Sequence, residues 1–166
     1  RGASPIVELV GYGTSADAYH LTAGPEDGDG ARRAMMAALA QAGIQAADVQ
    51  HLNAHATSTP VGDRGELAAI KRVFGDNNQI AVTSTKSATG HLLGAAGGIE
   101  AIFTALAIRD RRVPATRIPQ QADPFADGVD IVRGTARDMG IEHAISNGFG
   151  FGGVNASVLF KRWRGA

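Results

Sequence analysis

Residues 80–109 read IAVTSTKSATGHLLGAAGGIEAIFTALAIR, and this stretch is the clearest guide to the fold. It predicts a strand at Ile80 to Thr83, a loop rich in Ser and Thr over residues 84–91, and a long helix from Leu92 to Arg109. The apolar part of this helix, Leu92 to Ile108, contains a glutamate and is shorter than the run of about 20 apolar residues that spans a membrane. We therefore expect a buried helix of a soluble protein and no membrane association.

The same order of strand, polar turn and helix occurs earlier in the chain. Val49 to Ala54 predicts a strand, and residues 55–60 form a polar turn behind it. Asp63-Arg64-Gly65-Glu66 fits a capping box, which would open a helix that closes at Gly75. Two such units in succession indicate an α/β fold.

The remaining elements complete this fold class, which is α/β with a mixed sheet flanked by helices. Strands and helices alternate three times, and strands then follow strands, so we expect a mostly parallel sheet with an antiparallel end. The further elements are a strand at Ile6 to Val10 that turns at Gly11-Tyr12-Gly13, a loop over 14–30, a helix over 31–42, an irregular segment over 113–128, and strands at Val129 to Val132, Ala144 to Ser146 and Val154 to Phe160.

Composition limits the classes of function. The chain has 166 residues, the size of one domain, with 16 basic and 16 acidic side chains. This balance argues against a general nucleic-acid or membrane-surface binder. The chain has no Cys, which excludes a disulfide scaffold, a thiolate metal site and a cysteine nucleophile within these residues. The absence of Cys fits a reducing compartment, and we expect a cytoplasmic location.

Two histidines follow predicted strands at places where ligands bind in open α/β sheets. His55 opens the turn after one strand, and His91 lies between the next strand and the long helix, near Lys86. The positive end of a helix dipole disfavours an imidazolium, and a neutral ring can donate one N–H to a developing oxyanion. On spacing alone, these could equally be unrelated polar loop residues, with Lys86 an exposed lysine.

Glycines cluster at residues 148–153, which match the letters of a dinucleotide-binding fingerprint. No helix follows, since Val154 to Phe160 alternates like a strand, and too few residues remain for the expected acidic partner. We therefore reject dinucleotide binding. The cluster indicates either a hinged loop with Phe149 and Phe151 as aromatic gates, or a tight hairpin with two core phenylalanines. A zinc site and a serine triad both lack the necessary partners.

Taken together, these segments resemble the C-terminal half of the β-ketoacyl-acyl carrier protein synthases, most closely the elongating type II enzymes. The resemblance runs from end to end, and the motifs occur in the family's order. It rests on residues 8–13, 17–20, 53–63, 84–97 and 147–155.

The resemblance implies a thiolase-like fold, in which two similar halves stack as α-β-α-β-α layers. Residues 1–166 would be the C-terminal thiolase-like domain, and the nucleophilic Cys would lie in an N-terminal half that is absent here. The fragment alone is then expected to be inactive. The implied partners are acyl carrier protein, the N-terminal half and a second copy in a homodimer, with no nucleic acid, no membrane and no required cofactor.

The resemblance also implies roles for individual residues in a decarboxylative Claisen condensation of malonyl-acyl carrier protein with an acyl thioester. The two histidines would hydrogen-bond the malonyl thioester oxygen, Lys86 would support them, with Glu100 or nearby backbone as its partner, and the segment from Asp17 to Thr22 would be a second mobile loop. Ala56 stands where the family usually has Gly. The implied site residues are catalytic His55, His91 and Lys86, substrate-binding Thr57, Thr59, Phe149 and Phe151, and a possible Na⁺ or K⁺ site at Asn53, Glu100, Ser146 and Asn155.

Two alternatives remain at this stage. Some ketosynthase-like subunits lack the Cys and act as partners that set chain length, and a ketosynthase can also be a module of a polyketide synthase. In the thiolase fold the central helices of the two halves pack together, so we expect the small-residue helix from Leu92 to Ile108 to expose an apolar patch in this chain.

Overall fold

The computed structural model describes residues 2–75, 80–117 and 123–165. Within these ranges the helices alternate with the strands along most of the chain, as the sequence predicts. The helices are α1 (Asp29–Ala42), α2 (Pro60–Phe74), α3 (Lys86–Thr89) and α4 (Ala96–Asp110), and the strands are β1 (Val7–Ala16), β2 (His51–Asn53), β3 (Ala81–Thr83), β4 (Arg112–Val113), β5 (Arg137–Asp138), β6 (His143–Gly150) and β7 (Val154–Arg162).

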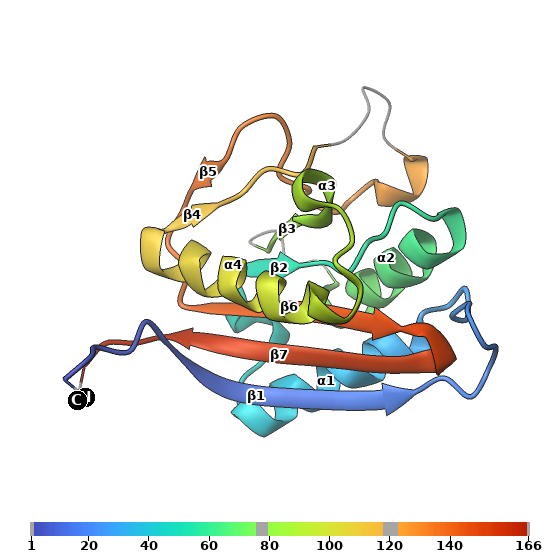
Figure 1. The fold of residues 1–166 in the computed structure, drawn as a ribbon, viewed down its shortest axis with the longest axis horizontal. Coiled ribbons are helices and arrows are strands. Elements are labelled where there is room, and N and C mark those ends of the chain that lie inside the picture. Colours follow the sequence, from blue (N-terminus) through green and yellow to red (C-terminus); the bar gives the residue numbers. More distant parts are fainter. Residues whose placement is uncertain (1, 76–79, 118–122, 166) are drawn as a thin grey trace.

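The main sheet is mixed, which confirms the predicted fold class. Its strand order is β1-β7-β6-β2-β3 (Figure 1). The strands β6, β2 and β3 run parallel, whereas β7 is antiparallel to both of its neighbours, β6 and β1. A separate two-stranded sheet pairs β4 with β5.

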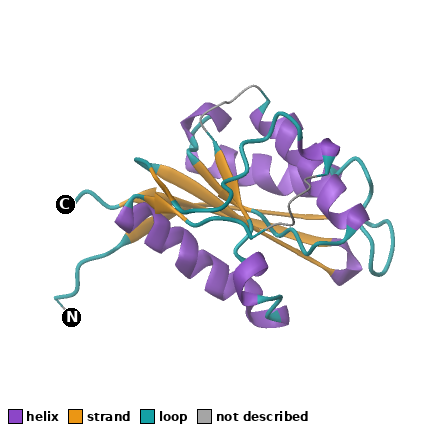
Figure 2. Cartoon of the chain, turned by 90° about the horizontal axis from the view of Figure 1, so that it is seen from above, coloured by secondary structure: helices purple, strands orange, loops and turns teal. Residues whose placement is uncertain are grey.

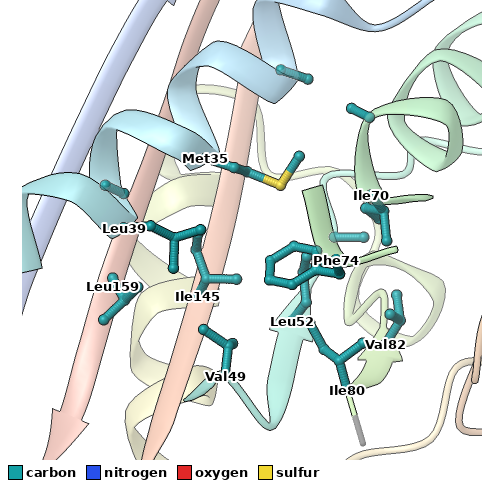
Figure 3. Close-up of a cluster of buried hydrophobic side chains, with 14 residues drawn as sticks. Met35, Leu39, Val49, Leu52, Ile70, Phe74, Ile80, Val82, Ile145 and Leu159 are labelled. Atoms are coloured by element: carbon teal, nitrogen blue, oxygen red, sulfur yellow. The ribbon is translucent and has the colours of Figure 1, made fainter. Parts of the chain in front are cut away.

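Helices cover both faces of the sheet (Figure 2). Neighbouring residues on one strand enter different apolar clusters, because side chains alternate between faces. Ile145 and Leu159 pack in the cluster that contains α1 and α2 side chains, and Ala144 and Phe160 pack in the cluster that contains the end of α4. The larger cluster includes Met35, Leu39, Val49, Leu52, Ile70, Phe74, Ile80, Val82, Ile145 and Leu159 (Figure 3).

The first strand is longer than predicted. It continues past the expected turn at Gly11-Tyr12-Gly13 to Ala16, because it pairs with β7 over its whole length. The two glycines mark a close approach of the strand to α1: a Cβ at Gly11 would lie 2.3 Å from the Ala38 carbonyl oxygen, and one at Gly13 would lie 2.0 Å from that of Ala34. Glycine inside a strand can indicate such an approach as well as a turn.

The predicted capping box at Asp63 is wrong. Helix α2 begins at Pro60 with Thr59 as its N-cap, because proline fits the first helical position. Glu66 therefore lies inside the helix, where it is buried. The Asp63 carboxylate instead accepts a hydrogen bond from the Ser58 backbone N–H at 3.1 Å.

Three further element boundaries differ from the prediction. Residues 84–91 include the short helix α3, and the long helix begins at Ala96, after a 3₁₀ turn over Leu93–Ala95. The expected strand at Val129 to Val132 makes only an isolated bridge at Ile131, and a second one follows at Arg133. Strands β6 and β7 extend into the glycine-rich segment, because each supplies the other's hydrogen-bond partners.

Helix α4 is buried on one side only. Glu100 and Thr104 face the sheet and are buried, whereas Ile102 is 54% exposed and Leu93, just before the helix, is 77% exposed. Among the described residues, no heavy atom outside the helix lies within 4 Å of a Cβ built at Gly97 or Gly98. The expected apolar patch is present. No helix in the described residues has both the length and the apolarity needed to cross a membrane.

Acid is expected to destabilise the fold through His51. The ring is 1% exposed, Nδ1 lies 2.9 Å from the Ala81 carbonyl oxygen, and burial lowers the pKa to about 4. The unfolded chain takes up this proton near pH 6.5, so between about pH 6.5 and pH 4 it binds more protons than the folded chain. We expect stability to be full above about pH 7 and to fall by about 3 kcal/mol by pH 4.

Urea unfolding at several pH values measures this effect. His51→Leu removes this titrating ring and is expected to make the pH dependence shallower, with the contribution of the other buried histidine, His55, retained. His20→Gln, at an exposed position, is the matched control and should keep the wild-type slope. An unchanged slope in His51→Leu would contradict the assignment.

Candidate active site

The structure brings His55 and His91 together. His55 lies two residues beyond the end of β2, and His91 lies two residues beyond the end of α3. Their ring centroids are 5.4 Å apart, with the rings nearly perpendicular. The two histidines that the sequence places in strand-to-helix connections therefore do lie side by side.

His55 sits in an environment that keeps its ring neutral. Its pKa is lowered to about 3, mainly by burial and in addition by the nearby charges of Lys86 and of His91 in its protonated form. The Nδ1 atom is buried, with no hydrogen-bond partner among the described residues. At neutral pH this ring carries a single proton, which it can donate to an acceptor.

A backbone hydrogen bond fixes the tautomer of His91 when the ring is neutral. The Leu93 backbone N–H donates to Nδ1 at 3.1 Å, so the ring proton resides on Nε2. Helix α4 begins only at Ala96, so its dipole contributes less than the sequence suggested, because the effect is confined to the first turn. His91 itself is exposed, which leaves Nε2 open to a substrate.

Lys86 is paired with Glu100 beneath the histidines. Nζ of Lys86, the first residue of α3, lies 2.5 Å from Glu100 Oε1, and both side chains are buried. Burial raises the pKa of the Glu100 carboxyl, and the Lys86 ammonium opposes this rise. The expected partner of Lys86 is thus the one observed.

Thr57 and Thr59 lie in the turn between His55 and helix α2. Their hydroxyl oxygens are 3.1 Å apart, so one can donate to the other. Thr57 is partly buried and Thr59 is exposed. Thr59 is also the N-cap residue of that helix.

The two phenylalanines of the glycine-rich segment take different positions. Phe149 is part of β6, and its ring centroid is 5.7 Å from that of His55. Phe151 is 80% exposed in the short turn between β6 and β7. Gly152 and Gly153 have φ values of +81° and +75°, which explains the glycines there. The segment is thus a tight hairpin, though only one of its phenylalanines is near the core.

Backbone hydrogen bonds join this hairpin to the Asp17–Thr22 segment. The Asp17 N–H donates to the Gly153 carbonyl at 2.8 Å, and the Gly152 N–H donates to the Leu21 carbonyl at 2.7 Å. The Asn155 side chain also donates to Asp17 Oδ1 at 2.7 Å. Two segments far apart in sequence are therefore held together by these hydrogen bonds.

The four residues proposed for a monovalent cation do not converge. Asn53 pairs in register with Ser146, and its side chain donates to the Glu100 carbonyl oxygen at 3.3 Å. Asn155, however, lies on the other face of the sheet and donates to Asp17. Glu100 is already paired with Lys86, so these side chains do not fit a single cation site. Among the described residues, no cluster of three or more His, Asp or Glu side chains is placed to hold a metal.

Glu66 is a site residue that sequence reasoning missed. Its carboxylate accepts hydrogen bonds from the backbone N–H groups of His55 and Ala56, at 2.9 and 2.7 Å. The available signal was a glutamate on the apolar side of a helix, 11 residues after a candidate histidine. The capping-box interpretation concealed it.

The mixed sheet and the paired histidines above a buried ion pair define a class: the chain is one half of a thiolase-like ketosynthase fold. It belongs to the β-ketoacyl synthase family, because the family model "Beta-ketoacyl synthase, C-terminal domain" matches residues 6–118.

Curated relatives and solved structures agree with this assignment. The chain is 55% identical over 164 residues to the 3-oxoacyl-[acyl-carrier-protein] synthase 2 of Staphylococcus aureus (strain COL), covering 98% of this chain and 39% of the relative. It is 51% identical over 166 residues to that of Rhizobium meliloti (strain 1021), covering 99% of this chain and 39% of the relative. A β-ketoacyl synthase structure from Burkholderia phymatum STM815 superposes with a TM-score of 0.92 at 37% identity, over 98% of this chain and 39% of that one. The chain thus spans about two fifths of the length of these proteins.

Proposed function

We propose that the chain forms the C-terminal half of a 3-oxoacyl-acyl carrier protein synthase of the elongating type. The observation that carries this proposal is the neutral His55 ring, 5.4 Å from the His91 ring and backed by the Lys86–Glu100 pair. Two adjacent imidazole rings whose N–H groups can converge on one oxygen suit the stabilisation of a thioester enolate.

The reaction follows from this geometry. A cysteine outside these residues carries the acyl chain as a thioester. The malonyl thioester binds with its carbonyl oxygen facing the two histidines, and the bond to its terminal carboxylate breaks. The electron pair left by CO₂ forms an enolate, whose negative oxygen accepts hydrogen bonds from His55 and His91. The enolate carbon attacks the acyl thioester, the cysteine leaves as a thiolate, and a 3-oxoacyl thioester two carbons longer results.

Further contacts of the whole protein follow from the same proposal. Thr57 and Thr59 would hydrogen-bond the pantetheine arm, and Phe149 and Phe151 would flank the acyl pocket. Acyl carrier protein is the proposed carrier of both substrates, in a cytoplasmic homodimer. One supporting observation is a solved neighbour, with a TM-score of 0.94 and 34% identity, described as a type II PKS acyl-carrier protein in complex with its ketosynthase.

A second candidate function is a Cys-less partner subunit that sets chain length. The supporting observation is the TM-score of 0.92 to a structure described as the ishigamide ketosynthase/chain length factor, at 34% identity. The retained histidines and ion pair favour the condensing role, because a purely structural subunit has no need of a neutral His55.

Malonyl-acyl carrier protein decarboxylation and condensation test the proposal. The chain is assayed alone and with a Cys-bearing N-terminal half, and we expect condensation only when both are present. Association should also abolish binding of an apolar dye to the exposed α4 face, which shows independently that the halves have assembled. Assembled halves without decarboxylation or condensation would favour the partner-subunit function.

A further inference from the structure

Lys86 and His91 lie on one short unit of backbone, residues 84–91, which is called the α3 unit below. Helix α3 begins at Lys86, and His91 follows two residues beyond its end. The Gly90 N–H donates to the Lys86 carbonyl oxygen at 2.8 Å, so the two ends of the helix are tied together. Contacts that fix this unit therefore fix the ammonium and the imidazole at the same time.

Two threonine hydroxyls join the α3 unit to the segment that follows β4. Thr116 Oγ1 accepts a hydrogen bond from the Ser84 backbone N–H at 2.9 Å and lies 3.0 Å from Thr83 Oγ1. The Thr83 hydroxyl donates its own proton to the Pro114 carbonyl oxygen at 2.9 Å. Because each hydroxyl has a single proton, Thr116 is the donor in its contact with Thr83. All protons in this chain thus have a direction, and the Thr116 oxygen is the acceptor for Ser84.

Ser87 provides a second anchor between the same two segments. Its hydroxyl donates to the Ser84 carbonyl oxygen at 2.7 Å and accepts from the Arg117 backbone N–H at 2.9 Å. The Ser84 hydroxyl in turn donates to the Ala56 carbonyl oxygen at 3.1 Å, one residue after His55. Ser84 is therefore the point where the loops of both histidines and the segment after β4 meet.

The segment after β4 is itself fixed to the main sheet. The Thr116 N–H donates to the Val132 carbonyl oxygen at 2.8 Å, and the Val132 N–H donates to the Val82 carbonyl oxygen of β3 at 3.0 Å. Thr116 and Ser84 are each 7% exposed, so water competes little for their hydrogen bonds. Thr116 thus refers the position of the α3 unit to the sheet.

We propose that Thr116 is a positioning residue for Lys86 and His91, which acts through the Ser84 peptide group, with Ser87 as the second anchor. The inference rests on the proposed function, because it assigns a purpose to the spacing of the two histidine rings. Thr116 takes no part in the chemistry and acts only through the backbone of the α3 unit.

The His91 ring depends on this support because it follows its own backbone. The ring is exposed, and the Leu93 N–H that binds its Nδ1 belongs to the same stretch of chain. A shift of the α3 unit would therefore carry the ring away from His55. Oxyanion donors act only when they are held in place, and a displacement of about 1 Å can alter a rate by about 100-fold.

NMR of the 166-residue chain tests the positioning without any assay of activity. Thr116→Val keeps the shape of the side chain and removes the hydroxyl. We expect the Ser84 amide proton, deprived of its acceptor, to exchange about tenfold faster or more. The nuclear Overhauser effect between the His55 and His91 rings, whose centroids are 5.4 Å apart, should become weaker.

Two further variants make this test specific for the hydroxyl. Thr116→Ser keeps the hydroxyl and is expected to restore both signals. Thr135→Val, at an exposed threonine, is the matched control and should leave both signals in place. If Thr116→Ser lost the ring-to-ring signal as fully as Thr116→Val, packing and not the hydroxyl would hold the unit, and the proposal would be overturned.

Ser87→Ala tests the second anchor and serves if Thr116→Val fails to fold. It removes the hydroxyl that joins the Ser84 carbonyl oxygen to the Arg117 N–H, and we expect the same weakening of the ring-to-ring signal. An unchanged ring-to-ring signal in the folded variants would overturn the positioning role.

A kinetic arm separates this inference from the proposed function. In the assembled enzyme, Thr116→Val should lower kcat for malonyl-acyl carrier protein decarboxylation by about 10- to 100-fold with KM changed less than about twofold, and Thr116→Ser should restore most of the rate. A KM effect alone would overturn the positioning role. An inactive wild-type assembly would reject the proposed function, and the NMR result would still decide whether Thr116 positions the α3 unit.

Discussion

His55→Ala is expected to lower the rate of malonyl-acyl carrier protein decarboxylation by about 10²–10³-fold, as removal of one oxyanion donor does in other enzymes. The ring of His55 is neutral at neutral pH because its pKa is lowered to about 3, mainly by burial, and a neutral ring has one N–H that can donate to the enolate oxygen. Since the enolate charge develops only during the reaction, kcat should fall while KM changes little. The measurement is steady-state decarboxylation by the chain assembled with a Cys-bearing half.

The control for this prediction is His143→Ala. His143 lies at the start of β6, and Phe149 lies near the opposite end of the same strand. The His143 ring approaches the Asp48 carbonyl oxygen. Its replacement should leave the rate within about twofold. A His55→Ala enzyme that retains full activity, while still folded and associated, would remove His55 from the chemistry.

Breaking the Lys86–Glu100 pair is expected to cost the largest amount of stability. Both side chains are buried with their charged atoms 2.5 Å apart, so Glu100→Ala leaves an ammonium buried without its counter-charge. Removal of one member of such a pair typically lowers the free energy of unfolding by about 3–5 kcal/mol. Urea unfolding of the chain measures this loss.

A double variant distinguishes the pair from simple packing. Lys86→Met with Glu100→Leu fills a similar volume without charge, and we expect it to recover most of the lost stability. Asp110→Asn, which breaks the exposed pair with Arg109, should have no measurable effect. Equal losses in the single and double variants would show that the charges do not act as a pair.

Much of the site could be predicted because its residues follow local patterns. The sequence indicates where strands end: His55 follows the end of β2, and His91 lies in the connection between β3 and the long helix α4. The family resemblance adds the roles of Lys86, Thr57 and Thr59, and their functions stay predictions until activity is measured. The prediction that a strand and not a helix follows the glycine-rich segment is confirmed, since Val154 begins β7.

The wrong predictions share a cause, since each depended on a contact between segments distant in sequence. Gly11 and Gly13 look like a turn, yet they admit the backbone of α1. Glu66 looks like a helix-capping residue, yet its oxygens bind a turn ten and eleven residues earlier. Asn155 has the right chemistry for a cation ligand, yet strand alternation places it on the other face from Glu100.

The amino-acid sequence by itself determined the α/β class, the mixed sheet, the placing of both histidines in strand-to-helix connections and the family. These depend on hydrophobic periodicity, turn chemistry and motif order, which are properties of neighbouring residues. Only the tertiary structure decided that His55 is neutral, that Glu66 holds its turn, and that one side of α4 is left uncovered. Burial, pKa values and long-range hydrogen bonds depend on which distant segments meet, and no local pattern carries that information.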